Sequence, residues 1–277
     1  MQKIMIIGDH DFPRPDTISQ IDRITFRTEE DDTSIPITSE AITQLLNIYD
    51  HIILQLPVDT QDQFIQGERT SLNQFITSLF LIVAKETNTN LHIQTNDDFT
   101  QISGISPLLL LEQNDSTFVS LSRKTYLASR HTVTSVQKWQ TNVIHQADEV
   151  AYQYYSWLQP FTKKIIRIEQ VRNGVHFKIT GFPVPLLILQ KVTPQLSPLM
   201  SEWNMKGGLL NKVSKKKKAS EGRLWFIVSE QHQPPIVFSA LTHFRPALPW
   251  PIYKLTQGLI HPFVMNQFSK QHMNKTD

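Results

Sequence analysis

Apolar residues recur with two different periods along the chain, and the change falls near its middle. In the first half, short apolar runs typical of buried parallel strands are separated by segments with helical spacing. We expect helices at 39–49, with Ser39 as the N-cap, and at 70–87. Strands are expected at 3–7, 23–27, 51–56, 90–94 and 108–111. This alternation predicts an α/β domain with a small, doubly wound, Rossmann-like parallel sheet over residues 1–125.

From residue 131 onward the pattern is rich in strands. The pair Asn173-Gly174 predicts a hairpin turn, and a helix is expected over 147–158. Strands are expected at 131–139, 165–171, 175–180, 183–190, 203–210, 223–230 and 236–244. A long apolar segment closes the chain. The order strand, helix, antiparallel strands, terminal helix predicts an α+β helix-grip fold for residues 126–277.

The closing segment at 244–268, FRPALPWPIYKLTQGLIHPFVMNQF, predicts a helix that is apolar on more than one face. Pro249 and Pro251 suit the first helical turn, and Pro262 should kink the axis. One arc, with Leu255, Leu259 and Phe263, is expected to pack on the sheet. The second arc must meet a cavity, the other domain or lipid, and we predict a ligand cavity lined by Tyr253, Ile260, His261, Val264 and Phe268.

Several motifs of the second half resemble those of a known family of domains. They are SVQKW at 135–139, YYSWL at 154–158, GFPVPLLILQ at 181–190, GGLL at 207–210, EGRLWF at 221–226 and the closing segment. They resemble a START-like (SRPBCC, helix-grip) domain of unknown function that often follows an NAD(P)-binding domain of the short-chain-dehydrogenase or nucleoside-diphosphate-sugar-epimerase type. The resemblance covers residues 131–277 and implies a curved sheet around the last helix with a cavity between them. It implies no catalytic residues, and in the first half only strand order and position are similar.

The glycine distribution argues against a nucleotide cofactor. The first strand is followed by GDHDFPRPD, in which Gly8 is the only glycine. A phosphate-binding loop needs several glycines for a close backbone approach, and Asp9 and Asp11 would repel the pyrophosphate. None of the six tyrosines is followed four residues later by lysine, the pair that short-chain dehydrogenases use. We therefore expect a degenerate first domain without cofactor, with NAD(P) binding through an atypical loop as the alternative.

Composition excludes further classes of function. The net charge of +2 gives no electrostatic reason to expect nucleic-acid binding, and the lack of cysteine excludes thiolate metal sites and cysteine nucleophiles. No metal site is expected at Asp9, His10 and Asp11, which suit a solvated loop. The N-terminus lacks the apolar region of a secretory signal, which favours the cytoplasm, and no transmembrane helix is expected. A basic run suits a solvated loop or contact with an anionic membrane: Lys215, Lys216, Lys217 and Lys218.

Three polar residues of the last part of the chain admit two interpretations. His261 lies beside the expected kink, and His243 and Arg245 lie at the end of the last strand. Each could hydrogen-bond a ligand or be satisfied within the core. The leading hypothesis is non-catalytic binding of an apolar small molecule by the START-like domain, with the first domain as scaffold or regulator. The alternatives are an NAD(P)-dependent oxidoreductase or epimerase, and an interaction protein without ligand.

Overall fold

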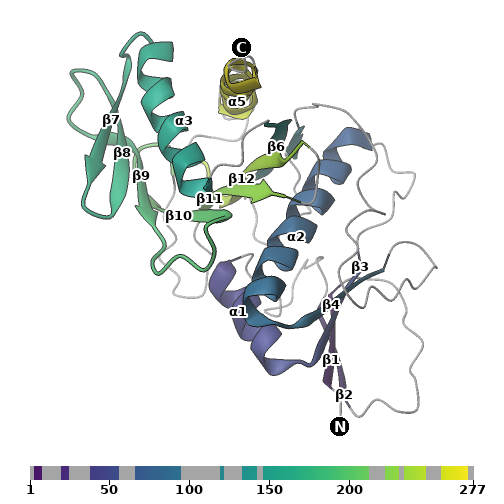
Figure 1. Cartoon of the computed structure of the whole chain (residues 1–277). Helices are drawn as coiled ribbons and strands as arrows, with labels where there is room; N and C mark the ends of the chain where they lie inside the picture. Colours follow the sequence, from purple (N-terminus) through teal and green to yellow (C-terminus); the bar gives the residue numbers. More distant parts are fainter. Residues whose placement is uncertain are drawn as a thin grey trace. The chain divides into compact units, whose positions relative to one another are not determined.

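The structure is a computed structural model, which describes residues 3–7, 20–24, 38–55, 66–94, 119–121, 133–141, 146–211, 222–230, 234–247 and 257–273. The chain divides into two compact units (Figure 1). Unit 1 comprises Met1–Asp115 and Lys124–Arg130, and unit 2 comprises Ser116–Arg123 and His131–Asp277. The strand expected at 108–111, the loop after the first strand and the basic run lie outside the described residues.

Unit 1 contains four described strands and two helices. The strands are β1 (Lys3–Ile7), β2 (Gln20–Ile24), β3 (His51–Gln55) and β4 (Asn90–Gln94), in the order β2-β1-β3-β4 with every pairing parallel. The helices α1 (Ser39–Ile48) and α2 (Gln66–Thr87) pack on each other. The second strand begins at Gln20, earlier than expected. The expected cap is wrong by one residue, because Thr38 is the N-cap and its hydroxyl accepts a hydrogen bond from the Ala41 backbone N–H at 3.0 Å.

Unit 2 is built on an eight-stranded antiparallel sheet in the order β5-β6-β12-β11-β10-β9-β8-β7. The strands are β5 (Val119–Leu121), β6 (Val133–Gln140), β7 (Ile166–Val171), β8 (Gly174–Ile179), β9 (Pro185–Lys191), β10 (Met200–Gly207), β11 (Arg223–Ser229) and β12 (Ile236–Phe244). Although β5 precedes the expected boundary at 125/126, it pairs with β6. The expected large antiparallel sheet is confirmed.

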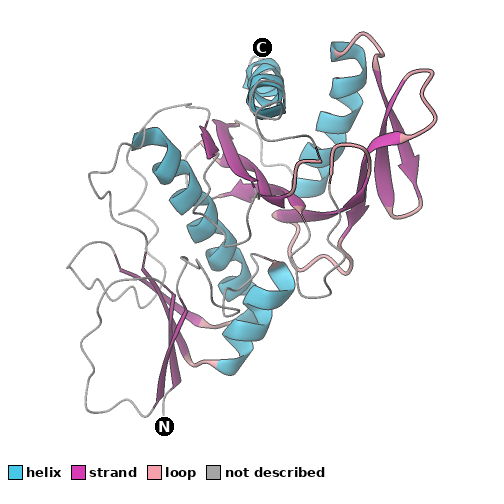
Figure 2. Ribbon diagram, turned by 180° about the vertical axis from the view of Figure 1, so that it is seen from behind, coloured by secondary structure: helices cyan, strands magenta, loops and turns pink. Residues whose placement is uncertain are grey.

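Two helices of unit 2, α3 (Ala147–Phe161) and α5 (Gln257–Met273), lie on the same face of this sheet (Figures 1 and 2). The element order strand, helix, antiparallel strands, terminal helix is the one expected for a helix-grip arrangement. α5 continues through Pro262, which lies in its second turn. The proline-rich segment at 249–251, where the helix was expected to begin, lies outside the described residues.

A hydrophobic core lies between the helices and the sheet of unit 2. Because side chains alternate across a strand, Leu224, Phe226 and Val228 of β11 point to the helices, and Trp203 and Met205 of β10 do the same. The helices contribute mainly aromatic and aliphatic side chains: Val150, Ala151, Tyr154, Tyr155 and Leu158 from α3, and Val264, Met265 and Phe268 from α5. Both α3 and α5 therefore contribute to the same core.

The β7–β8 hairpin differs in detail from its expected form. Val171 pairs with Gly174, so the two turn residues are Arg172 and Asn173 rather than Asn173 and Gly174. Gly174 serves a different purpose. A Cβ at this position would lie 2.3 Å from the carbonyl oxygen of Leu189 in β9, so the close approach of the neighbouring strand requires glycine.

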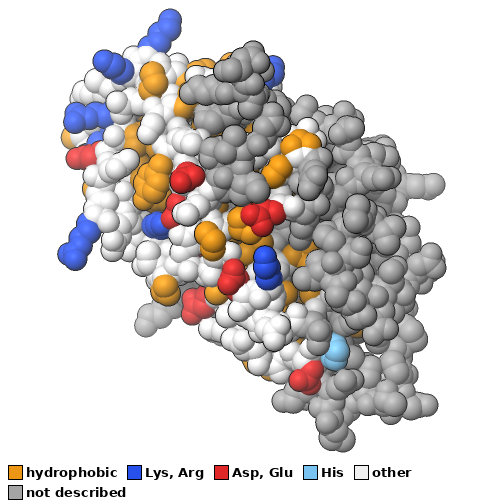
Figure 3. All heavy atoms as spheres, in the orientation of Figure 1, with side chains coloured by type: hydrophobic (Ala, Val, Ile, Leu, Met, Phe, Trp, Pro, Cys, Tyr) orange, Lys and Arg blue, Asp and Glu red, His pale blue; other side chains and the backbone are white. Residues whose placement is uncertain are grey.

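Surface charge is spread out on the face shown in Figure 3. There the described Lys and Arg side chains lie singly among Asp, Glu and polar groups, and they do not merge into one basic patch. Within the described residues, no helix has the length and apolarity that crossing a membrane would require.

Candidate functional site

The last helix, α5, is held against α3 and β6 by aromatic contacts. The Phe268 ring is fully buried, and its centroid lies 5.7 Å from Trp139 on β6 and 5.3 Å from both Tyr154 and Trp157 on α3. The Trp157 indole N–H also donates a hydrogen bond to the Gln271 side chain of α5. The pairs with Trp139 and Tyr154 are edge-to-face, a geometry that favours one fixed arrangement of the helices.

The two apolar arcs of α5 are used differently from the expectation. Phe263, which was expected to pack on the sheet, is 56% exposed, and its ring makes a tilted contact with Phe161 at 6.4 Å. Val264 and Phe268, from the other arc, are buried in the core. Helical spacing groups residues by direction but does not say which direction faces the sheet. The expected sheet-facing role of Phe263 is therefore wrong.

A polar patch interrupts the core beneath α5. Ser239 of β12 lies directly opposite Gln137 of β6 in the sheet, and Ser135 follows on the same face of β6. All three side chains are buried. The Ser239 hydroxyl lies 3.9 Å from the Met265 sulfur of α5, which shows that this patch faces the helix. Trp139, next along the same face of β6, joins the patch to the aromatic cluster around Phe268.

The Gln137 side chain is the least satisfied group of this patch. It is 1% exposed, and its Nε2 donates to the Ser135 hydroxyl at 2.6 Å. Its Oε1 has no hydrogen-bond partner in the described part of the chain. Exchanging the amide oxygen and nitrogen would only transfer the lack of a partner from one atom to the other. Either way, one strong hydrogen-bonding atom of this buried side chain has no partner among the described residues.

Two buried tyrosines adjoin the same core. Burial raises the pKa of both Tyr154 and Tyr155, so both phenols are neutral at physiological pH. The Tyr155 hydroxyl has no hydrogen-bond partner among the described residues. The Tyr155 ring packs edge-on against the rings of Trp203 and Phe177, at centroid distances of 5.2 and 5.6 Å. This hydroxyl, like the Gln137 amide, makes the helix-facing side less uniformly apolar than the sequence pattern indicates.

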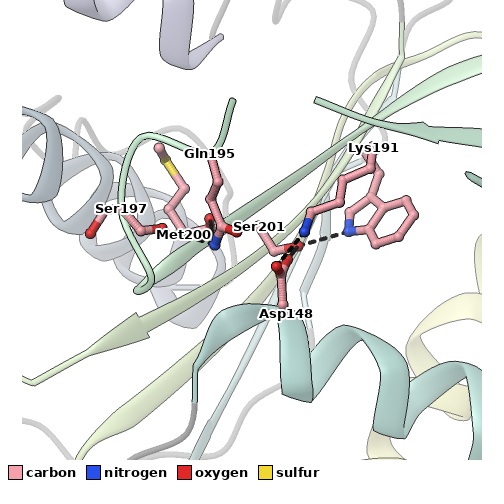
Figure 4. Close-up of polar contacts among 7 residues, drawn as sticks. Asp148, Lys191, Gln195, Ser197, Met200 and Ser201 are labelled. Atoms are coloured by element: carbon pink, nitrogen blue, oxygen red, sulfur yellow. Dashed lines mark hydrogen bonds and ion pairs between the residues drawn. The ribbon is translucent and has the colours of Figure 1, made fainter. Parts of the chain in front are cut away.

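The start of α3 is tied to the sheet by a polar network (Figure 4). Asp148 forms an ion pair with Lys191 of β9 and accepts a hydrogen bond from the Ser201 hydroxyl of β10 at 2.7 Å. The Trp203 indole N–H donates to the same hydroxyl at 2.8 Å. Figure 4 also shows Gln195, which donates to two backbone carbonyls, that of Ser197 in the loop before β10 and that of Met200 at the start of β10. These groups satisfy one another, so the network is structural and positions α3.

The end of the last strand also contains buried polar groups. His243 is 4% exposed, and burial, followed by the positive charges of Arg223 and Arg245, lowers its pKa to about 4. The imidazole is therefore neutral at physiological pH. Within the described residues, no group of three or more His, Cys, Asp or Glu side chains could hold a metal ion.

The structure describes the side chains of some predicted cavity residues and not of others. Val264 and Phe268 lie in the core beside the polar patch, whereas the side chains of Ile260 and His261 are not among those described, although both residues belong to α5. Tyr253 lies outside the described residues, so the cavity stays a prediction. Sequence reasoning missed Gln137. The available signal was a long polar side chain on the core face of β6, two residues from Ser135 on one side and Trp139 on the other.

The chain was compared with known proteins at three levels. No family model and no curated protein matches it. One similar solved structure is a conserved protein of unknown function from Enterococcus faecalis, at 12% identity over 54% of this chain and 76% of that chain, with a TM-score of 0.34. A START superfamily protein from Mycobacterium smegmatis is 8% identical over 50% of this chain and 96% of that chain, with a TM-score of 0.33. The Aha1 dimer from Colwellia psychrerythraea is 7% identical over 52% of this chain and 99% of that chain, with a TM-score of 0.33. Similarities this low support no conclusion about function.

Proposed function

We propose that unit 2 binds an apolar small molecule with one hydrogen-bonding group, at the polar patch of Ser135, Gln137 and Ser239 under α5. The observation that carries this proposal is the buried amide atom of Gln137 that lacks a partner among the described residues. A buried polar group without a hydrogen bond destabilises a protein by about 1–3 kcal/mol. A hydroxyl, carbonyl or amide of a ligand would supply the missing partner.

The surroundings of the patch suit such a ligand. Ligand sites in proteins are mainly apolar and contain a few polar groups that fix orientation. Here the apolar part is provided by Trp139, Val264, Met265 and Phe268. The affinity would come mainly from burying apolar ligand surface, at about 25 cal/mol per Å². The hydrogen bond to Gln137 would select among ligands of similar size.

The chemistry of the patch supports binding rather than catalysis. A serine nucleophile needs a base, commonly histidine, within hydrogen-bond reach. In the part of the chain that the structure describes, the side-chain contact of Ser239 is with the thioether of Met265. The buried histidine with a lowered pKa, His243, follows Ser239 by four residues in β12, beyond a shift in register. We therefore assign no reaction to this site.

For unit 1, the proposal is a Rossmann-like scaffold or regulatory module that does not use NAD(P). Its parallel strands and its two helices support the scaffold assignment. The single glycine and the two aspartates that follow β1 in the sequence support the loss of the cofactor.

A fluorescent fatty-acid or sterol-like probe tests the ligand site. We expect saturable binding to the full chain and much weaker binding to Val264→Trp, which adds bulk next to the patch. Phe263→Trp is the matched control, since it places the same side chain one residue away on the exposed side of α5. Circular dichroism establishes that both variants fold. Equal binding by the two variants, or no saturable binding by the parent chain, would contradict the proposal.

A further inference from the structure

The face of the sheet opposite the helices contains a second set of buried polar groups. Since Leu224 points to α3, its neighbour Arg223 points to the other side, and Asn204 does the same because Trp203 and Met205 face the helices. Arg223 lies directly opposite Asn204 on one side and Thr242 on the other. Side chains from β10, β11 and β12 therefore meet in one row. This row is separate from the patch around Gln137 and independent of the function proposed for it.

Arg223 has a partial set of partners. One terminal nitrogen, Nη1, lies 3.0 Å from Glu202 Oε1, and the two side chains are 15% and 4% exposed. The buried Nε of the same guanidinium has no hydrogen-bond partner among the described residues, and neither has Asn204 Oδ1 across the strand pair. Guanidinium groups bind oxyanions through just such remaining N–H donors, often two at a time.

His243 follows Thr242 of this row, at an irregularity in β12, and it lies close enough to Arg223 for that charge to lower its pKa. Between Leu241 and Phe244 the strand has one more residue than its partner β6, which is a β-bulge. His243 occupies the bulge with φ of 55°, in the left-handed region that residues other than glycine rarely adopt. Its Nδ1 is buried and has no hydrogen-bond partner in the described part of the chain. Bulges re-aim side chains and occur next to functional sites, and backbone strain of this kind is concentrated there.

We propose that Arg223, His243 and Asn204 form a binding site for one oxyanion, a phosphate or a carboxylate group. The Arg223 Nε–H and the imidazole N–H would donate to its oxygens, and the Asn204 amide would donate after exchanging its oxygen and nitrogen. Each of the three side chains has a buried atom without a described partner, and one small acceptor group would satisfy all three once the Asn204 amide is exchanged. The partial exposure of Arg223 provides the side from which the ligand reaches the site.

The electrostatics of His243 agree with this assignment. Its pKa is lowered by burial and by two neighbouring cations, Arg223 and Arg245. The positive charges of these two arginines would favour an anion at the same place, against the opposing charge of the Glu202 carboxylate beside Arg223. An anion bound there would in turn raise the pKa of His243, because an opposite charge nearby stabilises the imidazolium.

The test follows the His243 imidazole of the full chain by NMR, with its resonance assigned from His243→Asn. Asparagine is suitable because it tolerates the left-handed region and does not titrate. Inorganic phosphate, acetate and chloride are added in separate titrations at equal ionic strength, with the His176 resonance on β8 as the internal reference. We expect a saturable shift with an oxyanion and a rise of about one unit or more in the His243 pKa, with no such change in chloride. Saturation by phosphate or by acetate alone identifies which oxyanion the site prefers.

Variants of Arg223 separate recognition from general charge. Arg223→Lys keeps the charge but loses the Nε–H donor, and we expect it to weaken oxyanion binding about tenfold or more. Asn204→Ala, which leaves both cations in place, should weaken it less. Arg172→Gln, at an exposed turn of the β7–β8 hairpin, is the control and should bind as the parent chain does. The proposal is overturned if no oxyanion shifts His243 beyond the change in His176, or if Arg223→Lys and Asn204→Ala both bind as the parent chain does.

Discussion

Replacing Phe268 with alanine tests whether α5 closes the core of unit 2. The Phe268 side chain is fully buried and contacts three aromatic rings, those of Trp139, Tyr154 and Trp157. Truncating a buried phenylalanine to alanine commonly lowers the free energy of unfolding by about 3–5 kcal/mol, since apolar burial is lost and a cavity remains. For a unit of this size, that corresponds to a fall in Tm of roughly 6–20 °C.

Tryptophan fluorescence during urea denaturation is the appropriate assay for this change. All five tryptophans lie in the sequence of unit 2, at positions 139, 157, 203, 225 and 250, so the signal reports on that unit alone. Phe263→Ala is the control. Its side chain lies on the same helix but is largely exposed, and the expected loss is below about 1 kcal/mol. Equal losses in the two variants would refute the assignment of the buried face of α5.

Three further predictions concern other parts of the chain. Because the pKa of His243 is about 4 in the folded chain and ordinarily 6.5, the unfolded chain binds more protons between these pH values. This group therefore makes its full contribution to the free energy of unfolding above about pH 6.5, and the contribution falls by up to about 3 kcal/mol as the pH drops to 4. His243→Asn should lose this part of the pH dependence, and an unchanged dependence of its free energy of unfolding on pH would contradict the prediction. Asp148→Asn should lower the free energy of unfolding by about 1–3 kcal/mol because it leaves the Lys191 ammonium without its carboxylate. Glu149→Gln, which keeps a side chain suited to the capping box, should not lower it, and equal losses in the two variants would count against the network. NADH and NADPH should bind weakly or not at all in calorimetry because the loop after β1 has only Gly8, and a low-micromolar Kd would restore the oxidoreductase alternative.

Element order was more predictable from the sequence than side-chain placement. Hydrophobic period and turn residues indicate strands and helices locally, and β12 occupies the expected range, Ile236–Phe244. Terminal residues depend on caps and neighbouring strands. Thus the N-cap of α1 is Thr38 rather than Ser39, and Gly174 begins β8 instead of completing the turn. The cap depends on a local hydrogen bond from the Ala41 N–H, whereas the position of Gly174 depends on the close approach of Leu189, which is distant in sequence.

The candidate sites were harder to predict for a related reason. The sequence shows that α5 has two apolar arcs, but only the position of α3 and the sheet decides that Phe268 is buried and Phe263 exposed. Gln137 becomes notable only when its cross-strand neighbour Ser239 and the helix above it are known. His243 was identified as a polar residue at a strand end. The bulge in which it lies depends on pairing with β6 and has no signature in the local pattern.

The most direct test of the proposed function is whether Gln137 recognises the polar group of an apolar ligand. Dodecanol and dodecane have the same carbon chain and differ by one hydroxyl, so the difference in their affinities measures that contact. We predict that the parent chain prefers dodecanol by roughly two- to tenfold beyond the preference of Gln137→Leu, the range that one net hydrogen bond of about 0.5–1.5 kcal/mol allows. The same preference in both proteins, or no binding of either compound, would contradict the account.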